Sequence, residues 1–185
     1  MIDQVVDHCR KEMFRTEEAL RKELLRLRTG RASTTLLENI VVDYYGTKTP
    51  LSQIASLTAP EPRLLVVQPF DKSAISAIEK GILQSDLGLT PQNDGKLIRI
   101  PIPELTEERR KDLVKHVRKV GEEFRVSVRN HRRDAIEVLK RKTKDKEISE
   151  DDRRHGQDRI EGLTKEYVDK VEQVLKSKEQ EIMEI

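Results

Sequence analysis

The fold is decided by residues 105–143, which have the sequence LTEERRKDLVKHVRKVGEEFRVSVRNHRRDAIEVLKRKT. Apolar residues recur in this stretch at steps of three and four, the spacing of a helix that packs against another helix. At about 100° per residue they stay within one band of the helix surface. The predicted members of this apolar seam are Leu113, Val117, Val120, Phe124, Val128, His131, Ala135 and Val138.

Basic residues occupy the opposite side of the same predicted helix. They are Lys111, Lys115, Arg118, Arg125, Arg129, Arg132, Arg133 and Lys140. Arginine has a planar fork that suits phosphate oxygens, and acids are sparse between Arg125 and Arg133, apart from Asp134 next to them. The pattern favours contact with a polyanion, and the scarcity of aromatic residues favours structured RNA held through its backbone. The alternative is a charged face that serves only solubility.

Composition limits the class of protein. The chain has 185 residues, of which 38% are charged and 3% aromatic, and its net charge is only +2. Such a chain suits long helices, and any attraction to nucleic acid must come from local patches. The single Cys9 excludes an internal disulfide and fits a reducing cytoplasm. No apolar run of about 18 residues occurs, so we expect neither secretion nor a membrane span, and the modest charge favours a monomer.

Helical patterns flank a segment of different texture. Residues 2–28 have an apolar seam at steps of three and four, and Gly30 is the predicted helix stop. Between Gly30 and Pro103, short β-branched runs alternate with turn signals. These predict strands at 40–42, 64–67 and 97–100 and a short helix that begins near Asp71.

Two further helices follow Pro103. The first is predicted from Thr106 to about Thr143, and residues 144–148 form a turn. Ser149 and Asp152 have the spacing of a capping box that opens the last helix.

We therefore predict an α+β fold of two domains. Residues 1–29 and 105–185 form an elongated, coiled-coil-like three-helix bundle, domain I. Residues 31–103 form domain II, a small inserted α/β domain in which strands and a helix make a sandwich-like or barrel-like β-α-β unit. Two connections join the domains, which predicts a short double hinge near 30–31 and 103–105.

Catalytic chemistry has no support in the sequence. No nucleotide-binding, metalloprotease or serine-hydrolase motif is present, and the four histidines are scattered without metal-ligand spacing. His131 lies on the seam and is expected to be a semi-buried, hydrogen-bonded side chain. The acid pairs Glu17–Glu18 and Glu122–Glu123 are expected in solvent, and Asp151–Asp152 is expected at a helix N-terminus. We expect no enzyme activity, cofactor or metal.

A second basic cluster, Arg26, Arg28 and Arg31, surrounds Gly30. It complements a helix C-terminus, makes a second contact with a polyanion, or does both.

The chain resembles the bacterial ribosome recycling factor family over essentially its full length. The resemblance is carried by LRTGRAS (27–33), DYYGT (43–47), NDG (93–95), IPELTEERR (102–110) and VRNHRRDA (128–135). Two departures are Thr34, where many members have Pro, and His131, where an aliphatic residue is common. Neither alters the arginines.

The resemblance implies an L-shaped protein, similar in shape to tRNA, that acts in the cytoplasm on the post-termination ribosome. Domain I would bind large-subunit rRNA near the peptidyl-transferase region through Arg129 and Arg132, with Arg125 and Arg133 beside them. Elongation factor G, hydrolysing GTP, would push domain II, split the subunits and so release mRNA and tRNA.

The resemblance also implies that Arg28 and Arg31 are weaker rRNA contacts. The hinge would consist of Gly30, Arg31, Pro103, Glu104 and Leu105. Two alternatives remain open at this point: a helical RNA-binding adaptor or chaperone that works without elongation factor G, and an enzyme with its site in the insert.

Overall fold

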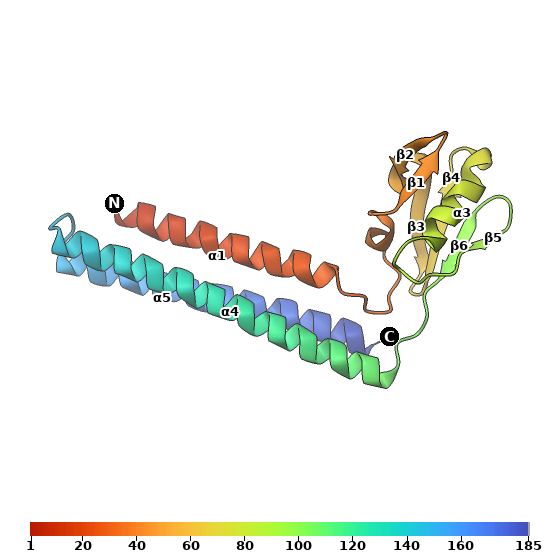
Figure 1. The fold of residues 1–185 in the computed structure, drawn as a ribbon. Helices are drawn as coiled ribbons and strands as arrows, with labels where there is room; N and C mark the ends of the chain where they lie inside the picture. The colour runs from red at the N-terminus through yellow and green to blue at the C-terminus, as the bar shows by residue number, and fades with distance from the viewer. Residues whose placement is uncertain (185) are drawn as a thin grey trace. The chain divides into compact units, whose positions relative to one another are not determined.

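A computed structural model describes residues 1–184, so the predicted domain I position Ile185 lies outside the described residues. Three long helices dominate: α1 (Ile2–Leu25), α4 (Glu107–Lys144) and α5 (Glu150–Met183). They form one compact unit, the bundle, from residues 1–27 and 107–184. Residues 28–106 form a second unit, the insert, which contains the strands and the short helices (Figure 1). These observations confirm the predicted two-domain α+β class.

The bundle core follows the predicted seams, with a shift at their far ends. Of the α4 seam, Leu113, Val117, Val120, Val128 and Ala135 are buried. The next buried residue of α4 is Leu139 and not Val138. The reason is that an α-helix has 3.6 residues per turn, so strict alternation of three and four drifts off the face and extra steps of four restore it.

His131 of α4 is semi-buried and hydrogen-bonded, as predicted. Its Nε2 lies 3.0 Å from Oγ1 of Thr16 on α1. The Thr16 hydroxyl donates to the Glu12 carbonyl at 3.0 Å, so it accepts from the imidazole N–H. This polar pair takes a place in the seam that an aliphatic residue would fill by packing alone.

The expectation for Glu17 is wrong. Its side chain is buried against the bundle, with 7% of the residue exposed. The carboxylate accepts from Nε and Nη2 of Arg21, one turn further along α1, at 3.1 and 2.8 Å. A buried charge needs such a partner, and the spacing of four residues supplies it.

The start of α5 lies where its capping residues predict it, whereas α1 ends earlier than the sequence predicts. Ser149 accepts from the backbone N–H of Asp152, and the Asp152 carboxylate accepts from that of Ser149, so the predicted capping box opens α5. The turn before it passes through Lys146 with a φ of 59°. Helix α1 ends at Leu25, three residues earlier than expected.

The insert contains two antiparallel sheets (Figure 1). One is the hairpin of β1 (Val41–Tyr44) and β2 (Thr47–Pro50), joined by Tyr45 and Gly46. The other has the order β3-β4-β6-β5, and its strands are β3 (Ala55–Glu61), β4 (Leu64–Pro69), β5 (Gln92–Asn93) and β6 (Ile98–Pro101). All neighbouring strands in it run antiparallel.

Helix α3 (Ile75–Leu83), preceded by a 3₁₀ turn at Lys72–Ala74, contributes its apolar side to the core of the insert. Helix α2 (Leu51–Ile54) and a 3₁₀ turn at Thr34–Leu37 complete the unit. The predicted strands near 40–42, 64–67 and 97–100 and the helix after Asp71 are present. Residues 1–184 include no helix that is both long enough and apolar enough to cross a bilayer.

Candidate nucleic-acid interface

The basic residues of α4 divide into two rows. Arg118, Arg125 and Arg132 are seven residues apart, so they project from nearly the same line along the helix. We call them the inner arginines, because each of them contacts α5. Arg129 and Arg133 lie further round the helix, and we call them the outer arginines.

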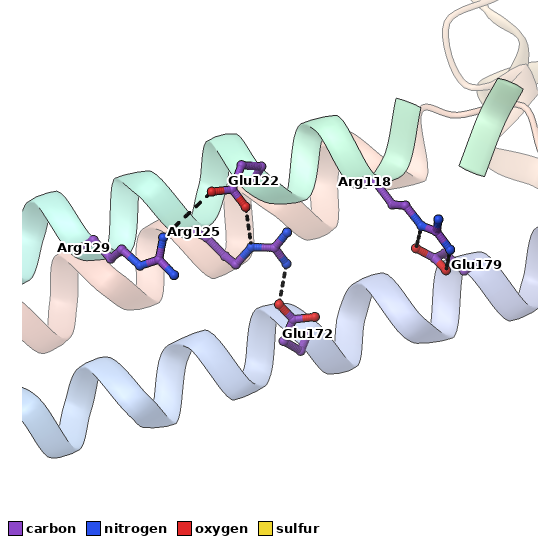
Figure 2. A network of polar contacts seen from close by, with 6 residues as sticks. All are labelled: Arg118, Glu122, Arg125, Arg129, Glu172 and Glu179. Carbon is purple, nitrogen blue, oxygen red and sulfur yellow. Dashed lines mark hydrogen bonds and ion pairs between the residues drawn. The ribbon is translucent and has the colours of Figure 1, made fainter. Parts of the chain in front are cut away.

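Arg125 is the most enclosed of these arginines, with 19% of its side chain exposed. Its Nε donates to Glu122 on α4 at 2.9 Å, and its Nη1 donates to Glu172 on α5 (Figure 2). Burial alone would lower the pKa of this guanidinium, but the hydrogen bonds to the two carboxylates outweigh burial and raise it. Arg125 is therefore held from both helices.

Arg132 is held by a single carboxylate. Its Nε lies 3.0 Å from each oxygen of Glu161 on α5, and its Nη2 donates to Oε1 at 2.6 Å. These bonds raise the pKa of the guanidinium. Arg118 faces Glu179 and Arg125 faces Glu172, so a further shift of seven residues on both helices would place Arg132 opposite Lys165. These two side chains have the same charge, and Arg132 instead pairs with Glu161, one turn further along α5.

Arg118 completes the series. Its Nε and Nη2 donate to Glu179 on α5 at 3.0 and 3.2 Å, and these bonds raise its pKa (Figure 2). Beside Arg118 and Arg125, a shallow groove of about 500 Å³ lies between α4 and α5. We call the three arginine–glutamate pairs the inter-helix ladder.

The outer arginines are much less constrained. Arg129 keeps 56% of its side chain exposed, and its nearest carboxylate oxygen, on Glu122, is 3.8 Å away (Figure 2). Arg133 is exposed, and within residues 1–184 no ion pair of Arg133 with a carboxylate is found. These two side chains can therefore turn toward an external phosphate without breaking a close internal pair.

The ladder corrects one expectation from the sequence. Acids are sparse along this stretch of α4, but the inner arginines are neutralised from α5. Glu161, Glu172 and Glu179 belong to the site and were missed. The sequence pattern that could have revealed them is a row of arginines seven residues apart, opposite acids on the next, antiparallel helix. This pattern can be recognised only when the register of α4 against α5 is known.

Arg28 and Arg31 have different environments within the insert. Arg28 donates through Nη1 to the Leu87 carbonyl and through Nη2 to the Asp86 carbonyl, both at 3.1 Å. Arg31 is exposed. Arg28 thus fixes the loop at 86–87, while Arg31 remains open to a ligand.

The residues predicted as a hinge make contacts with the insert. Gly30 has a φ of 76°, and a Cβ there would lie 2.9 Å from Cγ of Leu105. Glu104 forms an ion pair with Arg63, and the peptide N–H of Ile102, just before Pro103, donates to the Arg63 carbonyl at 2.8 Å. The division of the chain by contacts accordingly falls outside these residues, at 27–28 and 106–107.

The described residues show no cluster of metal-binding side chains. In the part of the chain that the structure describes, no three His, Cys, Asp or Glu side chains are grouped to hold an ion. Cys9 is buried, and burial together with the nearby Asp134 raises the pKa of its thiol to about 11.

Fold and site together define a class: a helical bundle that has arginines on one face and an inserted α/β unit. A family model described as "Ribosome recycling factor" matches residues 20–183. The chain therefore belongs to the ribosome recycling factor family.

Its curated relatives agree over the full length. The ribosome-recycling factor of Natranaerobius thermophilus is 54% identical over 181 residues, 98% of each chain. That of Carboxydothermus hydrogenoformans is 52% identical over 185 residues, the whole of both.

Solved structures extend the agreement to three dimensions. A solution structure of a ribosome recycling factor has a TM-score of 0.77 and 40% identity, and the match covers 100% of this chain and 98% of that one. A second structure presents the T. thermophilus ribosome recycling factor and E. coli elongation factor G on the E. coli post-termination complex. Its factor has a TM-score of 0.65 and 47% identity, with 98% of each chain covered.

Proposed function

We propose that this protein recycles ribosomes after termination. It binds the post-termination ribosome as a monomer in the cytoplasm and, with elongation factor G and the GTP hydrolysis of that partner, splits the subunits and releases mRNA and tRNA. The protein itself hydrolyses nothing. The observation that carries the proposal is a full-length family match together with exposed arginines on the longest helix.

The outer arginines make the first contact with rRNA of the large subunit near the peptidyl-transferase region. Arg129 and Arg133 are exposed and carry no close ion pair in the described chain, so they bind phosphate at little internal cost. Arg125 and Arg132 contribute through the N–H groups that their glutamates leave open. Arg31 is a further contact, and Arg28 acts mainly through the loop that it holds.

The two connections serve as a double hinge. Gly30, Arg31, Pro103, Glu104 and Leu105 belong to it, and several of them are tied to the insert, so the bend falls at their outer ends. A bundle stiffened by three helices then serves as a lever arm while a partner moves the insert.

Light scattering tests the function. Post-termination ribosomes, elongation factor G and GTP are mixed with and without the protein, and a fall in scattering that requires all components is expected. Binding without any fall, with elongation factor G from the same species, would contradict the proposal and leave an RNA-binding adaptor.

The variant R129A/R133A tests the interface. Loss of two charge-assisted contacts is expected to weaken ribosome binding on the order of tenfold to a hundredfold, with the melting temperature nearly unchanged. The control R10A/R15A removes the same charge from exposed positions on α1, where each side chain pairs only locally. Equal effects of the two double variants would rule out this interface.

A further inference from the structure

We propose that Glu161, Glu172 and Glu179 of α5 determine RNA specificity. They neutralise the charge of the inner arginines and so weaken the binding of unstructured RNA. The proposal rests on the proposed function, since it concerns the same arginine face. Nothing in the family match assigns a role to these acids.

The pairs lie where RNA can reach them. Glu161 and Glu172 keep 43% and 54% of their side chains exposed, and Glu179 keeps 28%. The pairs of Arg118 and Arg125 also border the groove between α4 and α5. A phosphate that approaches this line therefore meets arginine and carboxylate together.

Local neutrality acts differently on two kinds of RNA. A flexible single strand gains from each free cation by releasing counterions, and a paired arginine gives it little net attraction. A rigid RNA that places phosphates beside Nη1 of Arg132, the nitrogen that Glu161 leaves open, uses a guanidinium already held in position. The ladder therefore lowers binding to unstructured RNA more than binding to a matching surface.

A purely structural role does not account for the arrangement as well. Surface ion pairs such as those of Arg118 and Arg132 contribute about 0–1 kcal/mol each, and the apolar seam with Leu175 already holds α5 on α4. The ladder thus neutralises the charge of the three inner arginines but adds little to the stability of the bundle. Such an arrangement is typical of selection against wrong partners.

The test uses the triple variant E161Q/E172Q/E179Q, because glutamine keeps the shape and removes the charge. Binding to poly(U) RNA is followed by fluorescence anisotropy over a series of salt concentrations. We expect tighter binding by roughly tenfold or more, and a slope of log K against log salt that steepens by about 1.4, near 0.7 for each of Arg118 and Arg132. Arg125 adds little to this change, because Glu122 still pairs with it. The single variant E161Q frees Arg132 and is expected to give about half of the change in slope, which keeps the test valid if the triple variant folds poorly.

The control is E18Q/E23Q/E123Q, which removes the same charge at exposed glutamates on α1 and on the far side of α4. It is expected to leave poly(U) binding nearly unchanged. Unchanged poly(U) binding of the ladder variant, or an equal rise in both triple variants, would overturn the inference.

Failure of the inference and failure of the function remain distinguishable. Suppose that R129A/R133A loses ribosome binding while the ladder variant binds poly(U) like the unaltered protein. This pair of results overturns only the specificity role of the glutamates. A ladder variant with a lower melting temperature and unaltered poly(U) binding would assign the glutamates to helix packing instead.

Discussion

Gly30 holds a backbone conformation that other residues avoid. Its φ is 76°, and a Cβ would lie 2.9 Å from Leu105 Cγ. Gly46 has a similar φ of 78° but open space around it. Alanine at 46 is therefore expected to cost about 1–2 kcal/mol for the left-handed backbone alone. Alanine at 30 adds the displacement of Leu105, for a total of about 2–4 kcal/mol.

Urea unfolding of the two glycine variants measures the difference. The larger loss for Gly30→Ala is the signature of close packing against Leu105. If both variants lost the same stability, the contact would be unimportant and only the backbone conformation would matter.

Cys9 provides a prediction about pH. Its thiol pKa is about 11 in the folded protein against an ordinary value of 9.0, because burial and Asp134 disfavour the thiolate. Since the folded pKa is the higher one, this group's contribution to stability is complete below pH 9.0 and is lost as the pH rises toward about 11. Alkylation by iodoacetamide at pH 8 is expected to be slow.

The comparison for Cys9 is the same protein in denaturant, where the thiol should react at its ordinary rate. A native protein that reacts as fast as the unfolded chain at pH 8 would show that α1 leaves the bundle readily or that the thiol is not shielded.

Leu175 of α5 packs directly against α4 at Gly121. A Cβ there would lie 2.8 Å from Cδ2 of the buried Leu175 and closer still to Cδ1. Gly162, exposed in α5, has nothing within 4 Å. Gly162→Ala is expected to stabilise the bundle by up to about 1 kcal/mol through helix propensity. Gly121→Ala is expected to destabilise it by about 1–3 kcal/mol, because the clash exceeds that gain.

Thermal unfolding followed by circular dichroism compares these two variants of the same type in the same bundle. Opposite signs are expected. A rise in melting temperature for Gly121→Ala would mean that Leu175 repacks freely, and that the close approach is not needed to bring Arg118 and Arg125 to their glutamates.

Elements with a repeating pattern could be predicted, and those that depend on a partner could not. The seam of α4 and the capping box at Ser149 are local signals. Strand β3 was missed because it carries Pro60 and polar residues, which an edge strand tolerates. The pairing of Arg132 with Glu161 depends on helix register, which no single segment encodes.

At the scale of the molecule, the bundle is built from both ends of the chain. Residues 1–27 and 107–184 form it, and the insert has a buried core of its own. Figure 1 shows that α1 ends and α4 begins at the same end of the bundle. The bundle can therefore be closed without the insert by a short flexible link between Leu27 and Glu107.

Such a closed bundle separates binding of the ribosome from splitting of its subunits. It keeps the ladder and the outer arginines, so we expect it to stay helical by circular dichroism and to bind ribosomes with an affinity lowered only by the loss of the Arg31 contact. It lacks the unit that elongation factor G would move, so light scattering of post-termination ribosomes should not fall, and an excess should inhibit the full-length protein by competition. Splitting by the closed bundle would place the contact with elongation factor G on the helices and remove the need for a lever.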